Sequence, residues 1–343
     1  MSDVRFEVTG RVARITLDRP ARGNALTRRL VAELERTVER ADLDPRVHVL
    51  LLSGNGKGFC GGYDLIEYAE GHAAGGEPAQ GNGGDGAAWP DSAPQPPGDP
   101  AAPPPGSPLD PYVIMANHDP SQAWDPMVDY AMMSRNVRAF MSLFHCSQPV
   151  ICKVHGFCVA GGTDLALCSD LLLIADDAKI GYPPARVWGS PTTSLWAYRL
   201  GAQRAKRLLF TGDCLSGAEA LEWGLAVEAP SADQLDARTE ALVARIACMP
   251  VNQLQMMKLL VNQSLYSQGL HAAQTLGTIF DGVARHTSEG YAFQSLAAGE
   301  GFRAAVRERD QPFATDPARH PGSPDGVVAK PSGCDLGPST FKG

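Results

Sequence analysis

The amino-acid sequence predicts an α/β fold that is followed by a helical C-terminal region. Through the first two-thirds of the 343 residues, apolar runs typical of strands alternate with helical patterns, which is the arrangement of an α/β domain. From residue 201 onward the pattern is mostly helical. With 44% hydrophobic and 20% charged residues, the chain has the composition of a soluble globular protein.

The N-terminal segment predicts two strands, a helix and a third strand. Residues 4–17 contain two short β-rich runs that are joined by a glycine turn. Residues 24–41 carry three leucines and a valine at helical spacing. Residues 47–52 form an apolar run that ends before Ser-Gly, which predicts a buried strand. A further helix is expected after Tyr63.

Residues 71–110 differ sharply in composition from the rest of the chain. Nineteen of these 40 residues are Gly or Pro, and Leu109 is the only Val, Ile, Leu or Phe among them. Such a segment cannot bury enough apolar area to offset the entropy lost on ordering. We therefore expect a flexible surface insertion over residues 71–124, with a helix over residues 125–144.

Two strand–helix units and a run of helices complete the chain. Residues 149–154 predict a strand that leads to a helix from Gly161, and residues 171–175 predict another strand. Capping-box spacings at residues 216–219 and 231–234 predict two helix starts. We expect an α/β core, a helical C-terminal region and a loose tail, over residues 1–255, 256–312 and 313–343.

Charge and cysteine content exclude several classes of protein. The net charge of −8 argues against nucleic acid as the main partner. The eight cysteines form no CxxC pair, and together with the histidines they show no metal-ligand spacing, so we expect reduced thiols, a cytoplasmic protein and no metal. The first ten residues are too polar for a signal peptide, and no apolar run is long enough to span a membrane.

Two glycine-rich stretches, each after a predicted strand, are the candidate site. Residues 54–65 contain a loop of closely spaced glycines, and Gly161 and Gly162 open a predicted helix. Glycine lets the backbone approach a ligand closely, and two backbone N–H groups from such loops can form an oxyanion hole. The helix also carries Asp164 within an apolar run, where a carboxylate is costly unless it has a partner or a chemical role.

These stretches resemble the crotonase superfamily, the enoyl-CoA hydratase/isomerase family. The resemblance covers residues 1–70 and about 125–310. The motifs that carry it are Gly23-Asn-Ala-Leu26, Gly58 to Leu65, Val154-His-Gly156, Ala160 to Ala166, Ala178-Lys-Ile-Gly181, Leu208 to Asp213 and Ala218 to Leu225.

The resemblance implies a spiral of ββα units whose C-terminal helices build a homotrimer or a dimer of trimers. It implies an acyl-CoA thioester as ligand, with coenzyme A as part of the substrate and no separate cofactor. The backbone N–H groups of Tyr63 and Gly161 would hold the thioester oxygen. Other residues that the resemblance places at the substrate are Arg22, Ala25, Gly62, Asp64, Leu65, Gly162, Tyr182, Pro184 and Arg186.

The chain departs from the family pattern at both catalytic carboxylates. The first glutamate of family hydratases falls on Asp164, whose side chain is shorter by one methylene. The second falls on Pro184 or Ala185, depending on register, and neither residue can transfer a proton. We weighed three acids near the end of the insertion as replacements, namely Asp119, Asp125 and Asp129. A helix-start acid bonded to backbone N–H groups is the structural alternative for Asp164.

The leading hypothesis is an enzyme that adds water to a 2-enoyl-CoA, with Asp164 as its single catalytic carboxylate. One alternative is an isomerase, or another enolate reaction on an unusual acyl-CoA, because one carboxylate suffices for a 1,3-proton shift. A second alternative is a non-catalytic acyl-CoA binding protein.

Overall fold

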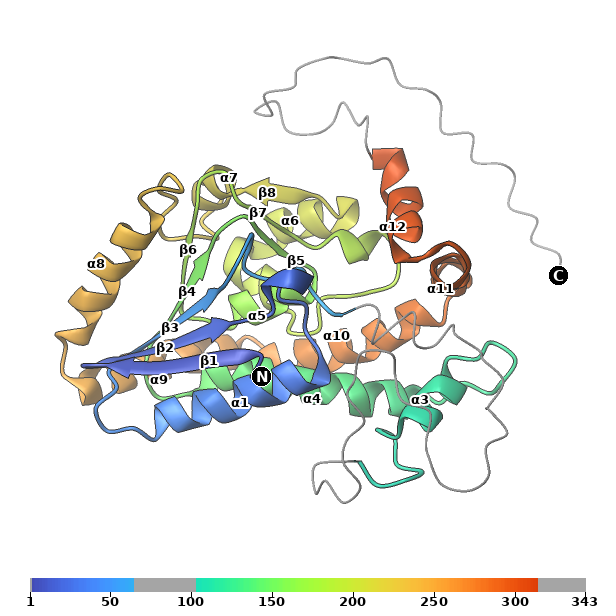
Figure 1. The fold of residues 1–343 in the computed structure, drawn as a ribbon, viewed down its shortest axis with the longest axis horizontal. Helices are drawn as coiled ribbons and strands as arrows, with labels where there is room; N and C mark the ends of the chain where they lie inside the picture. Colours follow the sequence, from blue (N-terminus) through green and yellow to red (C-terminus); the bar gives the residue numbers. More distant parts are fainter. Residues whose placement is uncertain (1, 65–102, 314–343) are drawn as a thin grey trace, which may run out of the picture.

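The computed structural model describes residues 2–64 and 103–313 of the chain (Figure 1). Its main sheet has five strands in the order β1-β2-β3-β4-β6. The first two strands are antiparallel and the others pair in parallel. These strands are β1 (Val4–Thr9), β2 (Val12–Leu17), β3 (Val49–Gly54), β4 (Val150–Val154) and β6 (Leu171–Ile174). Four of them lie within segments where the sequence predicts strands, and β3 extends two residues beyond the predicted segment of residues 47–52.

A second sheet of three short strands lies beside the first. In it, β5 pairs in parallel with β7, which pairs antiparallel with β8. The chain passes from β4 to β5 through Gly156, where φ is +59° and a Cβ atom would lie 2.0 Å from the Lys57 carbonyl oxygen. The strands are β5 (Phe157–Val159), β7 (Lys179–Gly181) and β8 (Cys214–Ser216). The sequence analysis missed all three.

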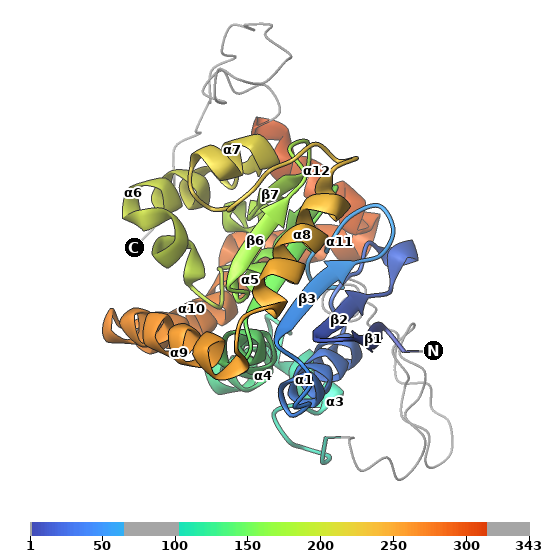
Figure 2. The same cartoon turned by 90° about the vertical axis from the view of Figure 1, so that its left-hand side faces the viewer.

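Helices cover the sheets and fill the C-terminal third. Figures 1 and 2 show α1, α4, α9 and α10 gathered beneath the main sheet, while α8 packs on β3, β4 and β6. The longer helices are α1 (Arg28–Asp42), α4 (Pro126–His145), α6 (Leu195–Thr211), α8 (Leu235–Ala247), α9 (Val251–Ser267), α10 (Leu270–Arg285), α11 (Ser288–Glu300) and α12 (Phe302–Asp310). The shorter ones are η1 (Pro20–Arg22), α3 (Pro111–Asn117), α5 (Gly161–Leu167), η3 (Pro183–Arg186), α7 (Gly217–Glu222) and η4 (Gln311–Phe313). None of the helices within residues 2–64 and 103–313 has the length and hydropathy to cross a bilayer.

The helix starts test the local predictions. Ser216 and Glu219 form the predicted capping box at the start of α7. The second predicted box is wrong, because α8 begins at Leu235 and no side chain caps it. The first helix begins later than predicted, at Arg28, because Asn24 adopts a φ of 54° and takes part in a loop.

Several predicted features fall outside the described residues. The helix expected after Tyr63, most of the expected insertion and nearly all of the expected tail belong to this group. Within the C-terminal part of the expected insertion, residues 111–117 form α3. Asp110 caps this helix, and Ile114 is one of its buried residues.

Candidate active site

The loop after β3 is fixed by the side chain of Asn24. Its amide donates hydrogen bonds to the carbonyl oxygens of Asn55 (2.8 Å), Gly58 (3.1 Å) and Phe59 (3.0 Å). Tyr63 then pairs with Leu26 as an isolated parallel bridge. The hydrogen bonds of that bridge come from the residues on either side of Tyr63. The N–H of Tyr63 therefore points away from Leu26.

The second loop, which ends at Ala160, leads into the start of α5 at Gly161. Ala160 precedes this helix with φ 55° and ψ −131°, a conformation that is rare for residues other than glycine. The Ala160 N–H donates a hydrogen bond to the Gly181 carbonyl oxygen (3.1 Å). The Thr163 N–H donates one to the Ala160 carbonyl oxygen (2.9 Å). Within the described parts of the chain, the Gly161 N–H makes no hydrogen bond. It is therefore available to a ligand oxygen.

Glycines allow the two loops to approach each other. A Cβ atom on Gly62 would lie 2.7 Å from the Ala160 Cβ and 3.4 Å from the Gly161 nitrogen. A Cβ atom on Gly161 would lie 2.7 Å from the ring of Tyr63. On Gly162 it would lie 2.7 Å from the Cys60 carbonyl oxygen. The structure thus brings together the two predicted oxyanion donors, Tyr63 and Gly161.

Asp164 is completely buried on the first turn of α5. Its Oδ1 accepts hydrogen bonds from the Thr193 N–H (3.0 Å) and the Thr193 hydroxyl (2.7 Å). Its Oδ2 has no partner among the described residues. Burial raises the pKa of Asp164 to about 7, although the bonds from Thr193 oppose this rise. One of its donors is a backbone N–H, as the helix-start alternative expects, but this donor comes from a distant loop and the second carboxyl oxygen has no partner among the described residues.

The buried carboxyl of Asp164 makes stability depend on pH. In an unfolded chain this group ionises near pH 4, whereas in the folded protein its pKa is about 7. Its contribution therefore lowers stability as the pH rises from about 4 to about 7. We expect the stability of Asp164→Asn relative to wild type to be higher at pH 8 than at pH 5, by on the order of 1–3 kcal/mol. Urea denaturation at both pH values measures this difference. The exposed control Asp177→Asn should show none, and an equal difference for both variants would contradict the expectation.

A cavity of about 230 Å³ lies beside the two loops. Its wall includes both loops, η3, the segment that follows η3 and the helices α10, α11 and α12. Tyr182 and Pro184 line the cavity and Ala185 does not, so of the two candidates for the second carboxylate position Pro184 is the one at the cavity. Asp164 does not line it. A substrate therefore reaches the Asp164 Oδ2 only if side chains at that end of the cavity move.

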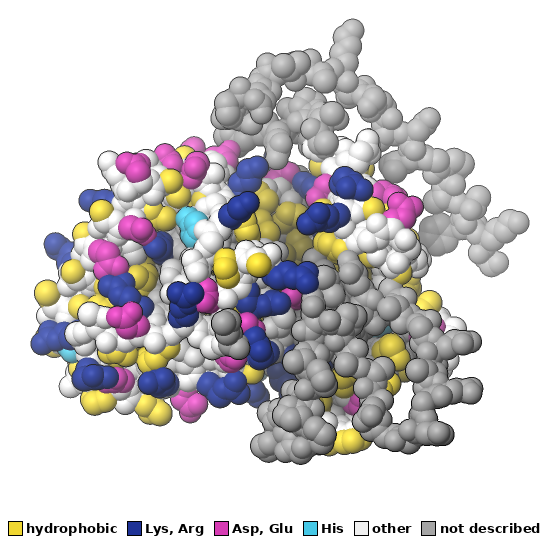
Figure 3. Space-filling view, in the orientation of Figure 1, with side chains coloured by type: hydrophobic (Ala, Val, Ile, Leu, Met, Phe, Trp, Pro, Cys, Tyr) yellow, Lys and Arg dark blue, Asp and Glu magenta, His cyan; other side chains and the backbone are white. Residues whose placement is uncertain are grey.

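The surface near α12 carries positive charge. Figure 3 shows hydrophobic side chains at the bottom of a hollow beside the segment that carries α12, with Lys and Arg side chains on both sides of it. Arg309 of α12 lines the cavity. Its guanidinium is paired with Asp310 at 2.8 Å.

Two charged residues of the cavity were missed by the sequence analysis. Asp281 and Arg285 lie one turn apart on α10, and both line the cavity. Arg285 Nη1 lies 2.9 Å from Asp281 Oδ2, and Arg285 Nη2 lies 2.7 Å from Asp129 Oδ1. Burial raises the pKa of Asp281, and Arg285 opposes the rise. An acid and an arginine four residues apart on a helix were the signal that could have identified this pair.

None of the three acids proposed as replacements lines the cavity. Asp119 accepts hydrogen bonds from Ser121 in an exposed turn. Asp125 caps α4. Asp129 is buried, and its Oδ1 bonds to Arg285. In the structure described, none of the three acids is therefore placed to act as a second catalytic acid.

The surroundings of Asp129 also bear on metal binding. In the part of the chain that the structure describes, His118, Asp129 and His286 place their ligand atoms within 4.8 Å of one another. Asp129 Oδ2 already accepts hydrogen bonds from Asn117 (2.9 Å), Trp124 (2.8 Å) and His286 (3.0 Å). Its other oxygen bonds to an arginine. A carboxylate whose oxygens already accept hydrogen bonds from protein donors, one of them a guanidinium, is a poor metal ligand. We therefore assign no metal to this cluster.

The remaining predicted residues of the first loop region are Arg22, Ala25, Asp64 and Leu65. Arg19 donates to the Ala25 carbonyl oxygen (2.6 Å) and forms an ion pair with Asp64 (3.0 Å). Arg22 is exposed on η1 and does not line the cavity. Leu65 lies outside the described residues.

Arg186 ties η3 to two other elements. Its guanidinium donates to the Thr211 carbonyl oxygen (2.8 Å) and pairs with Asp213 (3.3 Å) and Asp310 (2.9 Å). Arg186 does not line the cavity. The structure therefore gives it a role in fixing the loop that carries Tyr182 and Pro184.

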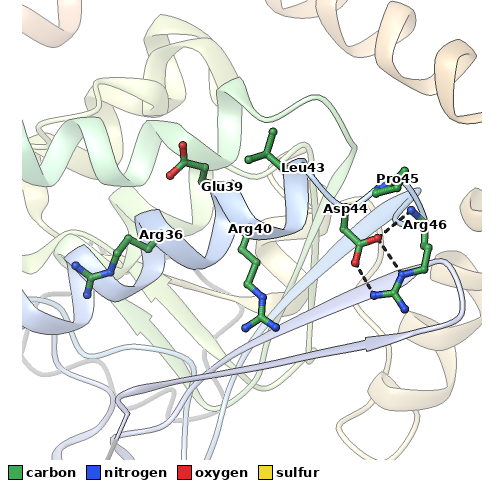
Figure 4. A pocket seen from close by; sticks show the side chains of 7 residues that line it. All are labelled: Arg36, Glu39, Arg40, Leu43, Asp44, Pro45 and Arg46. Carbon is green, nitrogen blue, oxygen red and sulfur yellow. Dashed lines mark hydrogen bonds and ion pairs between the residues drawn. The ribbon is translucent and has the colours of Figure 1, made fainter.

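A second depression lies on the surface at the C-terminal end of α1 (Figure 4). Its polar side chains include the ion pair between Asp44 and Arg46. The residues around it are Arg36, Glu39, Arg40, Leu43, Asp44, Pro45 and Arg46. None of the predicted site residues is among them, so we assign it no part in the chemistry.

Comparison with known proteins identifies similar chains. The family described as enoyl-CoA hydratase/isomerase matches residues 7–83 and 123–294. The crystal structure of an enoyl-CoA hydratase from Mycobacterium smegmatis has a TM-score of 0.78 and 53% sequence identity, and the match covers 90% of this chain and 93% of that chain. Carnitinyl-CoA dehydratase of Proteus mirabilis (strain HI4320) is 26% identical over 242 residues, which are 69% of this chain and 72% of the relative. EchA13 of Mycobacterium tuberculosis (strain ATCC 25618 / H37Rv), whose name refers to enoyl-CoA hydratase, is 27% identical over 328 residues, which are 89% and 92% of the two chains.

Proposed function

Because the chain belongs to the enoyl-CoA hydratase/isomerase family, the crotonase superfamily, we propose that it adds water to the double bond of a 2-enoyl-CoA. The observation that carries this proposal is the meeting of the Tyr63 and Gly161 loops, with the buried Asp164 one turn beyond Gly161. The names of the similar hydratases and of the dehydratase support water as the group added or removed.

The proposed mechanism begins at the thioester carbonyl. Its oxygen accepts hydrogen bonds from the N–H groups of Tyr63 and Gly161, which stabilise the negative charge that develops there. The oxygen of a water molecule bonds to the β-carbon while Asp164 takes a proton from that water. The π electrons of the double bond move toward the carbonyl and form an enolate.

The same carboxyl completes the reaction. Protonated Asp164 returns its proton to the α-carbon, and the enolate becomes the thioester of a 3-hydroxy acid. A pKa of about 7 suits a group that must both accept and donate a proton near neutral pH. One carboxyl therefore serves both steps, whereas Pro184 at the second position contributes only to the shape of the cavity.

Isomerisation is the second candidate, and the presence of Pro184 in the cavity wall favours it. A single carboxylate can move a proton between the α- and γ-carbons without water. Incubation with matched 2-enoyl and 3-enoyl thioesters, followed by mass spectrometry, separates the two reactions. A product heavier by one water from the 2-enoyl substrate supports hydration. Interconversion of the two substrates without a change in mass would replace hydration by isomerisation.

We also propose that the protein is a homotrimer or a dimer of trimers. The support is a set of exposed apolar side chains on α9 and α10, and Figure 2 shows α9 at the edge of the molecule. Such a face is costly in water unless a partner covers it. The side chains are Met256, Met257, Leu259, Leu260, Val261, Leu276, Ile279, Phe280 and Val283.

Replacing Leu260 with glutamate is expected to weaken this assembly, because the charge would be buried at the interface. Leu260 is 67% exposed in the single chain, and Leu43, at the far end of α1, is 76% exposed. Leu43→Glu is therefore a matched control. Sedimentation velocity should show trimers or hexamers for wild type and for the control, and smaller species for Leu260→Glu. A monomeric wild type would contradict the proposal.

The reduced state of the thiols supports a cytoplasmic location for the proposed enzyme. Seven cysteines in the described ranges are free, and five of these are buried. Free buried thiols are typical of proteins from reducing compartments.

A further inference from the structure

The cavity combines an apolar wall with one buried ion pair. Tyr63, Tyr182, Val187 and Phe293 are among its apolar lining residues. Within this surface lies the Asp281–Arg285 pair, whose two side chains are only 7% and 8% exposed. A straight alkyl chain would leave these charged groups facing hydrocarbon, which is unfavourable.

Two hydrogen-bond donors of the cavity wall lack partners among the described residues. The Nε–H of Arg285 and the Nε1–H of Trp188 are both buried and unbonded. Trp188 has a φ of 76° and packs against Phe293 with 5.6 Å between ring centroids. A non-glycine residue in that conformation is strained, and such strain is found preferentially at functional sites. Trp188, Arg285 and Asp281 all line the cavity, so a polar ligand group that enters between their side chains can satisfy the two donors.

The packing of α10 against α4 does not require Asp281. Arg285 of α10 donates a hydrogen bond to Asp129 of α4, and this bond links the two helices without Asp281. Asp281 lies on the cavity side, where its Oδ1 accepts a weak hydrogen bond from the Ser190 N–H at 3.3 Å. Both of its carboxyl oxygens already face donors, since Arg285 Nη1 lies 2.9 Å from Oδ2 and the Ser190 N–H lies 3.3 Å from Oδ1. A role in recognition fits Asp281 better than one in proton transfer.

We propose that the cavity selects acyl-CoA thioesters whose acyl group carries a hydroxyl group away from the thioester, bound by Asp281, Arg285 and Trp188. A hydroxyl donates to the Asp281 carboxylate and accepts from one of the two unbonded N–H groups, so it satisfies both kinds of group. This inference rests on the proposed function, because the thioester oxygen must occupy the Tyr63–Gly161 loops for the acyl group to enter this cavity.

The charge balance favours a neutral oxygen group over a carboxylate. Asp129 and Asp281 both pair with the single cation of Arg285. Arg309, the other arginine of the cavity wall, is already paired with Asp310 at 2.8 Å. A second carboxylate on the ligand would therefore meet an excess of negative charge.

Calorimetric binding of saturated thioesters tests this inference without requiring turnover. The probes are ω-hydroxyhexanoyl-CoA and ω-hydroxyoctanoyl-CoA beside hexanoyl-CoA and octanoyl-CoA. We expect wild type to bind at least one hydroxylated probe about ten- to a hundredfold more tightly than its unsubstituted partner. Asp281→Asn should reduce that preference about tenfold, and Trp188→Phe should reduce it severalfold. The matched control is Asp44→Asn, at an ion-paired aspartate outside the cavity, and it should keep the preference.

Each contrary outcome has a distinct meaning. Equal affinity within both probe pairs would overturn the inference, as would an undiminished preference in Asp281→Asn. If Asp281→Asn instead lowered turnover of all 2-enoyl thioesters alike and left binding unchanged, Asp281 would be a catalytic acid and the recognition role would be wrong. Absence of turnover with the hydroxyl preference intact would count against the proposed hydration alone.

Discussion

Replacing Asp164 with asparagine is expected to lower kcat for the hydration of a 2-enoyl-CoA by about 10²- to 10⁴-fold. Asparagine keeps the shape of the side chain and can keep the two hydrogen bonds from Thr193 to one oxygen. It cannot accept a proton from water or return one to the α-carbon. Binding of a saturated acyl-CoA should change little, because the Tyr63 and Gly161 loops are untouched. Single-turnover rates and calorimetric affinities measure the two effects separately.

Two further variants sharpen the Asp164 prediction. Asp164→Glu restores the residue type of the family pattern and keeps an acid, so it should retain more turnover than asparagine does. The exposed Asp177→Asn is an isosteric control and should leave kcat unchanged. Undiminished turnover in Asp164→Asn would exclude Asp164 as the proton-transfer group.

A methyl group at position 161 is expected to have the second large effect, lowering kcat about 10²- to 10³-fold. In Gly161→Ala the new Cβ atom would lie 2.7 Å from the ring of Tyr63. The ring must then move, which disturbs the residue that carries the other oxyanion donor. The loss corresponds to roughly 2.7–4 kcal/mol of transition-state stabilisation, as for removal of one oxyanion donor.

The matched control for this variant is Gly299→Ala on α11. A Cβ atom there meets no other atom within 4 Å, so the change adds a methyl group without a clash. Kinetics of both variants on the same thioester, with circular dichroism to confirm folding, provide the comparison. If Gly161→Ala kept the kcat of Gly299→Ala, the close contact of the two loops would not matter for catalysis.

The sequence predicted those features that depend on local pattern. β2 is a short β-rich run and β3 is built on an apolar run, and both were found. β5, β7 and β8 have three residues each, which is too short for a periodic signal. They form because Gly156 lets the chain cross into a second sheet, and that crossing depends on a contact with the distant Lys57.

The same distinction holds within the candidate site. The two glycine-rich loops were predicted because each follows a strand, and the family resemblance then pointed to Tyr63 and Gly161 within them. Asp281 was missed because only the tertiary packing of α10 brings it to the cavity. Asp129 shows the converse: its sequence position suggested the acyl pocket, but Arg285 and its other donors occupy the carboxylate.

Mixing the protein with crotonyl-CoA and with a longer 2-enoyl-CoA, and following the absorbance of the conjugated thioester, tests the proposed hydration directly. The expected result is loss of conjugation with at least one substrate for wild type and a slower loss for Asp164→Asn, with a product heavier by one water. No change in absorbance for wild type with either substrate, while both thioesters bind, would contradict hydration of a 2-enoyl-CoA by this protein.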